Sequence, residues 1–204
     1  MLRIVAVPLL FLLVGSALAV AQGHLPVRPG LIGLAVMLAS AFVVRRHWRS
    51  LHVDRELGSP ERALWHALAS RALIAGQLLM SLGLIGPAMH LHSVAVHAMA
   101  VDSWTLVLGA IVSFYIARDP EPRSDERDNA FVARATRIAY ATLIAQLSVV
   151  IVILSFGADF NLPAFSQPLI AHALIVCLML ASMVRSAVQL ALYHFDQHTA
   201  FASV

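Results

Sequence analysis

Hydrophobic residues occur along this chain in long runs, separated by short stretches rich in arginine, acids, glycine and proline. Six runs can be drawn, over residues 4–21, 30–45, 67–89, 99–117, 136–157 and 167–191. A helix needs about 20 apolar residues to cross the hydrocarbon core, and isolated strands cannot satisfy their backbone in lipid. The pattern therefore predicts an all-α fold, a polytopic integral membrane helical bundle of about six transmembrane helices, as one membrane domain over residues 1–204.

Composition supports the membrane class. Only 12% of the residues are charged, against about 25% in a soluble domain, and the mean hydropathy is +0.82. The runs 30–45 and 99–117 are short for a membrane span. Arg45 and Arg118 stand at their ends, where long side chains can reach the headgroups and make up the difference.

The first run allows two interpretations. Arg3, the apolar stretch and the small residues of "SALAVA" are also typical of a signal peptide. The stretch from Ile4 to Ala21 has 18 residues, however, which is longer than the usual apolar region of a signal peptide. We favour a retained first helix, in which Pro8 can introduce a kink that membrane packing tolerates.

The arginines predict the orientation. All fourteen basic residues are arginine, and thirteen fall on one side if six helices cross the membrane in turn, with Arg28 alone on the other. The positive-inside rule then places both termini in the cytoplasm, and we expect a bacterial inner-membrane protein. Because these arginines flank apolar segments, they indicate contact with the lipid bilayer and not with nucleic acid.

A weak internal repeat links two parts of the chain. "SPERALWHALASRALIAGQ", starting at Ser59, resembles "SDERDNAFVARATRIAYATLIAQ", starting at Ser124, so that Arg71 matches Arg137. Upstream, "AFVVR" at 41–45 resembles "SFYIAR" at 113–118. We interpret this as two helix–loop–helix units, over residues 30–90 and 99–157, an arrangement found in transporters and in other membrane proteins.

The densest charge cluster is "DPEPRSDERDNAFVARATRIAY", residues 119–140, with five acids and four arginines. Ser124 is placed to cap a helix, with acids in its first turn. Glu126, Arg127, Arg134 and Arg137 then share an arc of about 100°, and Asp128 lies off it. One interpretation is a helix start anchored among headgroups. The other is a docking face for a cytoplasmic protein or a second copy, with these candidates: Asp125, Glu126, Arg127, Asp128, Arg134, Arg137, Glu61, Arg62 and Arg71.

The same segment resembles a known signature. "SDERDNAFVARATRIAYATLI" is similar to a family of uncharacterised prokaryotic multi-pass membrane proteins, in which an Asp-Glu-Arg-Asp run precedes Arg-Ile-Ala-Tyr and a membrane helix. "MVRSAVQLALYHFDQ" also looks like the C-terminus of that family. The resemblance covers residues 119–197. It implies a multi-helix membrane protein, and it implies no particular activity.

The opposite side of the membrane carries a histidine-rich stretch, "GPAMHLHSVAVHAMAVDSW". Histidine and methionine suit copper, and histidine also suits zinc. We expect no cofactor, and the alternative is a copper, zinc or haem b site in a transporter or redox protein. The candidate metal ligands are His90, His92, His97, Asp102 and His172, and His97 with His172 is the pair suited to haem.

Polar residues inside the apolar runs are few. Gln77, Gln146 and Gln189 are expected to form hydrogen bonds between helices, and Cys177 to be a small buried residue. No Gly-rich phosphate loop, GxSxG or HExxH motif occurs, which argues against a conventional enzyme. The sequence therefore predicts a non-enzymatic membrane protein that acts through partner contacts at its cytoplasmic charged loops.

Overall fold

A computed structural model describes residues 2–22, 24–50, 59–85, 93–118, 126–156 and 166–202, and this part of the chain forms six α-helices. The helices are α1 (Leu2–Val20), α2 (Pro29–Ser50), α3 (Ser59–Ile85), α4 (Val94–Ala117), α5 (Glu126–Phe156) and α6 (Gln167–Ala202). The described residues contain no strand, and each helix is long and apolar enough to cross a membrane. The predicted all-α, six-helix membrane class is thereby confirmed.

Several helices extend beyond the apolar runs that predicted them. Helix α3 begins at Ser59, where the serine and the following proline predicted a start, and α6 continues to Ala202. Helix α5 begins at Glu126, so its predicted cap Ser124 lies outside the described residues. Hydropathy marks only the part of a helix that suits hydrocarbon, and the polar turns continue the same hydrogen-bond ladder beyond it.

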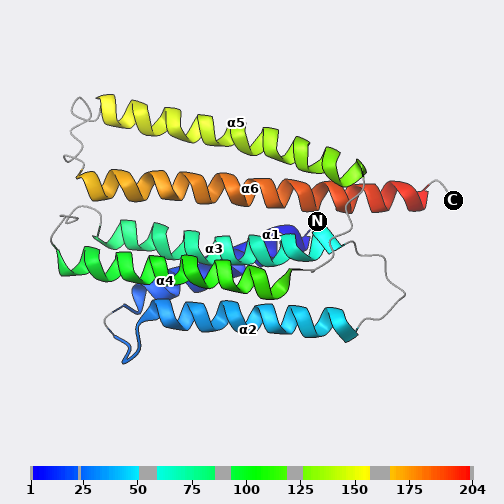
Figure 1. The fold of residues 1–204 in the computed structure, drawn as a ribbon. Coiled ribbons are helices and arrows are strands. Elements are labelled where there is room, and N and C mark those ends of the chain that lie inside the picture. Colours follow the sequence, from blue (N-terminus) through cyan, green and yellow to red (C-terminus); the bar gives the residue numbers. More distant parts are fainter. Residues whose placement is uncertain are drawn as a thin grey trace.

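The helices run alternately in opposite directions along the bundle, and the chain begins and ends toward the same end (Figure 1). That end is called the arginine-rich end, because it carries a set of basic residues on four helices: Arg3, Arg45, Arg46, Arg118 and Arg127. Arg28, just before α2, lies at the opposite end. The alternation gathers charges that are far apart in sequence at one level of the bundle.

Neighbours in the bundle are mostly not neighbours in the sequence. Helix α3 occupies the centre and packs against α1, α4 and α6, while α2 packs against α4 (Figure 1). Helix α5 lies at the edge, beside α6 (Figure 1). The core cluster accordingly draws on five helices: Leu18, Met37, Leu73, Ile74, Leu78, Leu106 and Val176. Cys177 is buried next to it, as predicted.

Helices α1 and α3 touch at their backbones. A Cβ atom added to Gly15 would lie 2.0 Å from the Leu73 carbonyl oxygen, and one added to Gly76 would lie 2.0 Å from the Leu12 carbonyl oxygen. The Ser16 hydroxyl donates a 3.2 Å hydrogen bond to the Gly76 carbonyl oxygen. Small residues permit such close approach between membrane helices. Helix α1 is thus packed closely against α3, and its retention in the mature protein stays a prediction.

The hydrogen bonds of the glutamine side chains differ from those predicted. Within the part of the chain that the structure describes, the side-chain oxygens of Gln77 and Gln146 have no hydrogen-bond partner, and neither has the Ser81 hydroxyl. Gln189 donates to the Tyr193 hydroxyl at 3.4 Å, but both residues belong to α6. The amides therefore do not supply the hydrogen bonds between helices that the sequence suggested.

Candidate functional sites at the arginine-rich end

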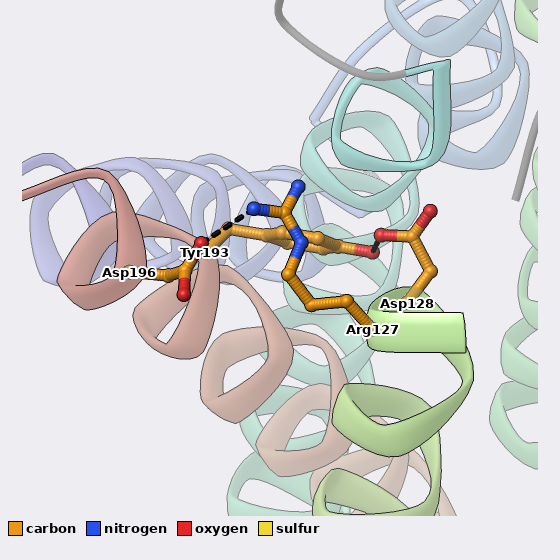
Figure 2. A network of polar contacts seen from close by, with 4 residues as sticks. All are labelled: Arg127, Asp128, Tyr193 and Asp196. Carbon is orange, nitrogen blue, oxygen red and sulfur yellow. Dashed lines mark hydrogen bonds and ion pairs between the residues drawn. The ribbon is translucent and has the colours of Figure 1, made fainter. Parts of the chain in front are cut away.

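Two polar contacts, a hydrogen bond and an ion pair, hold the start of α5 against the last turns of α6. The Tyr193 hydroxyl donates a 2.7 Å hydrogen bond to the Asp128 carboxylate, and Arg127 Nη1 donates to Asp196 Oδ2 at 2.5 Å. Figure 2 shows Arg127 and Asp128, from α5, facing Tyr193 and Asp196, from α6. The Phe131 ring meets the Tyr193 ring edge-on at 5.3 Å between centroids. Together these contacts fix the position of the first turns of α5.

Asp128 is buried in this network, together with its partner Tyr193. It is the third residue of α5, where a negative charge is stabilised by the free N–H groups of the helix start. Its phenol donor supplies a further compensating hydrogen bond. The sequence placed Asp128 off the charged arc, and in the structure it shares the face of α5 that is buried with Ala135 and Ala139. Its observed contacts give it a structural role.

The charged arc of α5 points away from this interface. Glu126, Arg134 and Arg137 are exposed, and on a helical wheel the centre of the arc lies about 150° from the buried face. Arg127 stands at the edge of the arc, which is why it can reach α6. Asp125, also a predicted docking residue, lies outside the described residues. The exposed arc therefore presents one acid and two arginines from a helix with a fixed position.

The three candidates on α3 are placed differently. Glu61 is partly exposed in the first turn, and Arg62 lies in the same turn, with its side chain outside the described part. Arg71 lies about 12 Å further along the membrane-spanning segment that begins at Ala63. It is partly buried against α6, whereas its proposed repeat counterpart Arg137 is exposed. The two arginines thus occupy different environments, and the internal repeat stays a prediction.

Arg71 contacts α6 through one nitrogen. Its Nη1 donates to the Ser186 hydroxyl at 2.5 Å and to the Ser182 carbonyl oxygen at 3.3 Å. Beside it is a cavity of about 410 Å³ between α3, α4 and α6. Its lining includes polar and aromatic side chains from α3 and α4, namely His66, Ser70, Arg71, Phe114 and Tyr115, and Met179 from α6. A positively charged group therefore borders a space large enough for part of a small molecule or lipid.

His66 closes the cavity between α3 and α4. Its Nε2 lies 2.8 Å from the Ser113 hydroxyl oxygen and 3.4 Å from the Ser70 hydroxyl oxygen. Since Ser113 donates its own proton to the Ala110 carbonyl oxygen at 3.0 Å, we assign the proton of the imidazole to Nε2. Sequence reasoning missed His66 as a site residue. The available signal was a histidine and a serine four positions apart, with an arginine directly after the serine, within an apolar helix.

The predicted metal ligands have separate roles where they are described. His172 Nδ1 donates to the Pro168 carbonyl oxygen at 2.7 Å, and His97 is exposed. The buried Asp102 carboxylate accepts a hydrogen bond from the Gly30 backbone N–H, at the start of α2. Among the described residues, no three His, Cys, Asp or Glu side chains gather at a metal-binding distance. His90 and His92 lie outside that part, so copper, zinc and haem b stay predictions.

The chain has no significant match among models of protein families, curated proteins or solved structures.

Proposed function

We propose that the protein is a non-enzymatic bacterial inner-membrane protein that acts through a partner at the arginine-rich end. The observation that carries this proposal is the exposed arc of Glu126, Arg134 and Arg137, opposite the face that α5 buries. The absence of the common catalytic motifs from the sequence favours binding over catalysis.

The orientation assigned to this end is cytoplasmic. The positive-inside rule supports that assignment, because short loops rich in arginine remain on the cytoplasmic side. Arginines from separate loops and helix ends gather there, including Arg3, Arg46 and Arg118. Both chain termini would then be cytoplasmic.

A protein partner is supported by the rigidity of the arc. The contacts of Asp128 with Tyr193 and of Arg127 with Asp196 hold the start of α5 in one position, so that ordering it costs little on binding. The arc also carries an acid, Glu126, at one edge beside its arginines, and mixed charge favours a partner with a complementary arrangement over a uniformly anionic surface. We assign the partner as an acidic segment of another protein.

The family resemblance falls on the same contacts. Asp128 and Arg127 belong to the first resembling stretch, and Tyr193 and Asp196 to the closing one. The observed bonds join these two stretches, which supports a shared structural purpose for them. We therefore propose membership of that family of uncharacterised prokaryotic membrane proteins for residues 119–197.

Photocross-linking in living cells tests the partner. A photoreactive amino acid replaces Arg134, and a matched probe replaces Val149, which is exposed on the apolar part of α5. We expect position 134 to capture a defined protein that position 149 does not capture. If the captured protein is a second copy of the chain, the partner is another subunit of a homo-oligomer.

Charge reversal supplies the control. Arg137→Glu combined with the probe at position 134 should abolish the cross-link, because the complementary charge is lost. Arg45→Glu with Arg46→Glu reverses exposed charges at the same end on α2 and should leave the cross-link intact. Capture that is equal at 134 and 149, or unchanged after Arg137→Glu, would refute the proposal.

A further inference from the structure

The guanidinium of Arg71 is incompletely satisfied. Both of its hydrogen bonds, to Ser182 and Ser186, use Nη1. Within the described residues, neither Nε nor Nη2 meets an acceptor, and no carboxylate pairs with the side chain. Arg185, on α6, adds a second positive charge close enough to interact with it. The region therefore carries positive charge with no negative charge of its own.

Such a charge is costly inside a membrane-spanning helix. An arginine within the hydrocarbon region is unfavourable on its own, and such residues are commonly paired or face a cavity. Arg71 lies beside a cavity, and its serine partners bring no counter-charge. An anion bound in the cavity would supply the counter-charge by accepting hydrogen bonds from Nε and Nη2 of Arg71.

The lining of the cavity changes from polar at one end to apolar at the other, which suits an amphiphilic ligand. Its polar lining, with His66, Arg71 and Tyr115, lies toward the arginine-rich end, and Ile74 and Val107 extend its wall deeper into the bundle. An anionic headgroup at one end and a hydrocarbon chain at the other would match this gradient.

The rim of the cavity is open to the surroundings of the bundle. Ile111 is 50% exposed, Phe114 is 42% exposed and Tyr115 is 62% exposed, all on α4. The floor, at His66 and Ser70, is buried. Because α4 is a membrane-spanning helix, its exposed face meets lipid, and the ligand can enter sideways from the bilayer.

We propose that this cavity is a binding site for an anionic phospholipid, whose phosphate contacts Arg71 and whose acyl chain runs along Ile74 and Val107. Arginine binds phosphate oxygens through two parallel N–H groups, and Nε with Nη2 forms such a pair. Basic pockets between membrane helices are known to take lipid headgroups.

Native mass spectrometry of the full chain in mild detergent tests the site. The protein is titrated with phosphatidylglycerol and with phosphatidylcholine of the same acyl chains. We expect phosphatidylglycerol to bind at least about tenfold more tightly, as one charge-assisted pair would provide. Arg71→Gln should remove this preference, and Arg71→Lys, which keeps the charge but loses the paired N–H groups, should keep only part of it. Arg137→Gln, the same change on the exposed face of α5, should leave it intact.

A second variant keeps the test decisive if Arg71→Gln fails to fold. Ile111→Trp narrows the cavity at its exposed rim and leaves Arg71 in place, so it should weaken phosphatidylglycerol binding with the bundle intact. Equal binding of the two lipids to the native protein, or undiminished preference in both variants, would overturn the proposal. Complete displacement of the lipid by millimolar inorganic phosphate would also overturn it, by showing that the site takes the free anion.

Discussion

The hydroxyl of Tyr193 and the carboxylate of Asp128 meet at 2.7 Å, although the two residues are 65 positions apart. Helix α5 lies at the edge of the bundle and packs mainly against α6. Its buried residues are one acid and two alanines, which contribute little apolar area. The buried hydrogen bond therefore adds to the packing of partly buried residues, such as Phe131, in holding α5 in place.

Tyr193→Phe should loosen α5. The change removes the hydroxyl but keeps the ring against Phe131, so that the buried Asp128 carboxylate loses the hydrogen bond from this donor. We expect a loss of about 1–3 kcal/mol in the free energy of unfolding, measured by SDS titration in mixed micelles. Tyr140→Phe, at an exposed tyrosine of α5, is the matched control and should have no effect. Equal behaviour of the two variants would contradict the assigned role.

The ion pair between Arg127 and Asp196 should contribute far less to stability than the hydrogen bond of Tyr193. Arg127 and Asp196 have side chains that are 54% and 35% exposed, so water and salt screen their attraction. A double-mutant cycle with Arg127→Gln and Asp196→Asn should give a coupling energy below about 1 kcal/mol, smaller still at high salt. A coupling larger than the effect of Tyr193→Phe would reverse this ranking.

Replacing each of two glycines on α3 by alanine should change stability in different ways. Gly76→Ala places a methyl group against the Leu12 carbonyl oxygen at 2.0 Å, so α1 and α3 must separate and lose their close packing. Gly83→Ala meets nothing within 4 Å and should be neutral, or more stable by about 0.5–1 kcal/mol, because alanine favours the helix. The same SDS titration compares them. Comparable stability of the two variants would show that α1 does not lie against α3 as described.

Asp102 should act as an acceptor for the start of α2. Asp102→Leu leaves the Gly30 N–H without its partner in an apolar setting, whereas Asp102→Asn keeps a side-chain oxygen. We expect the leucine variant to lose about 1–3 kcal/mol in the free energy of unfolding and the asparagine variant clearly less. Zinc or copper binding to the native protein that Asp102→Asn abolishes would instead assign Asp102 to a metal site.

The sequence allowed the number and type of helices to be predicted, because apolar runs of this length have one stable form in lipid. The wheel also placed Asp128 apart from Arg134 and Arg137, which depends only on helical geometry. It could not predict Tyr193 as the partner of Asp128, because no local pattern links positions 65 apart. The packing order of the helices was likewise beyond the sequence, since it depends on small residues such as Gly15 meeting across the bundle.

Comparison of Arg71 with Arg137 shows another limit. Both follow a similar local motif, and the sequence treats them as equivalent. In the structure, Arg71 belongs to the central helix and meets α6, while Arg137 belongs to the edge helix and is exposed. The environment of a charged residue in a bundle is set by which helices surround it, and a local repeat does not specify that.

The interleaved order of the helices has a consequence for biogenesis. Helix α1 packs chiefly on α3 and α2 chiefly on α4, so the first two helices to enter the membrane do not have each other as main partners. Each therefore stays in the bilayer without its main packing partner until a later helix emerges from the ribosome. The backbone contact at Gly15 and Gly76 can then form only after the second hairpin has begun to insert. Assembly would proceed by late rearrangement within the membrane, and not one hairpin at a time.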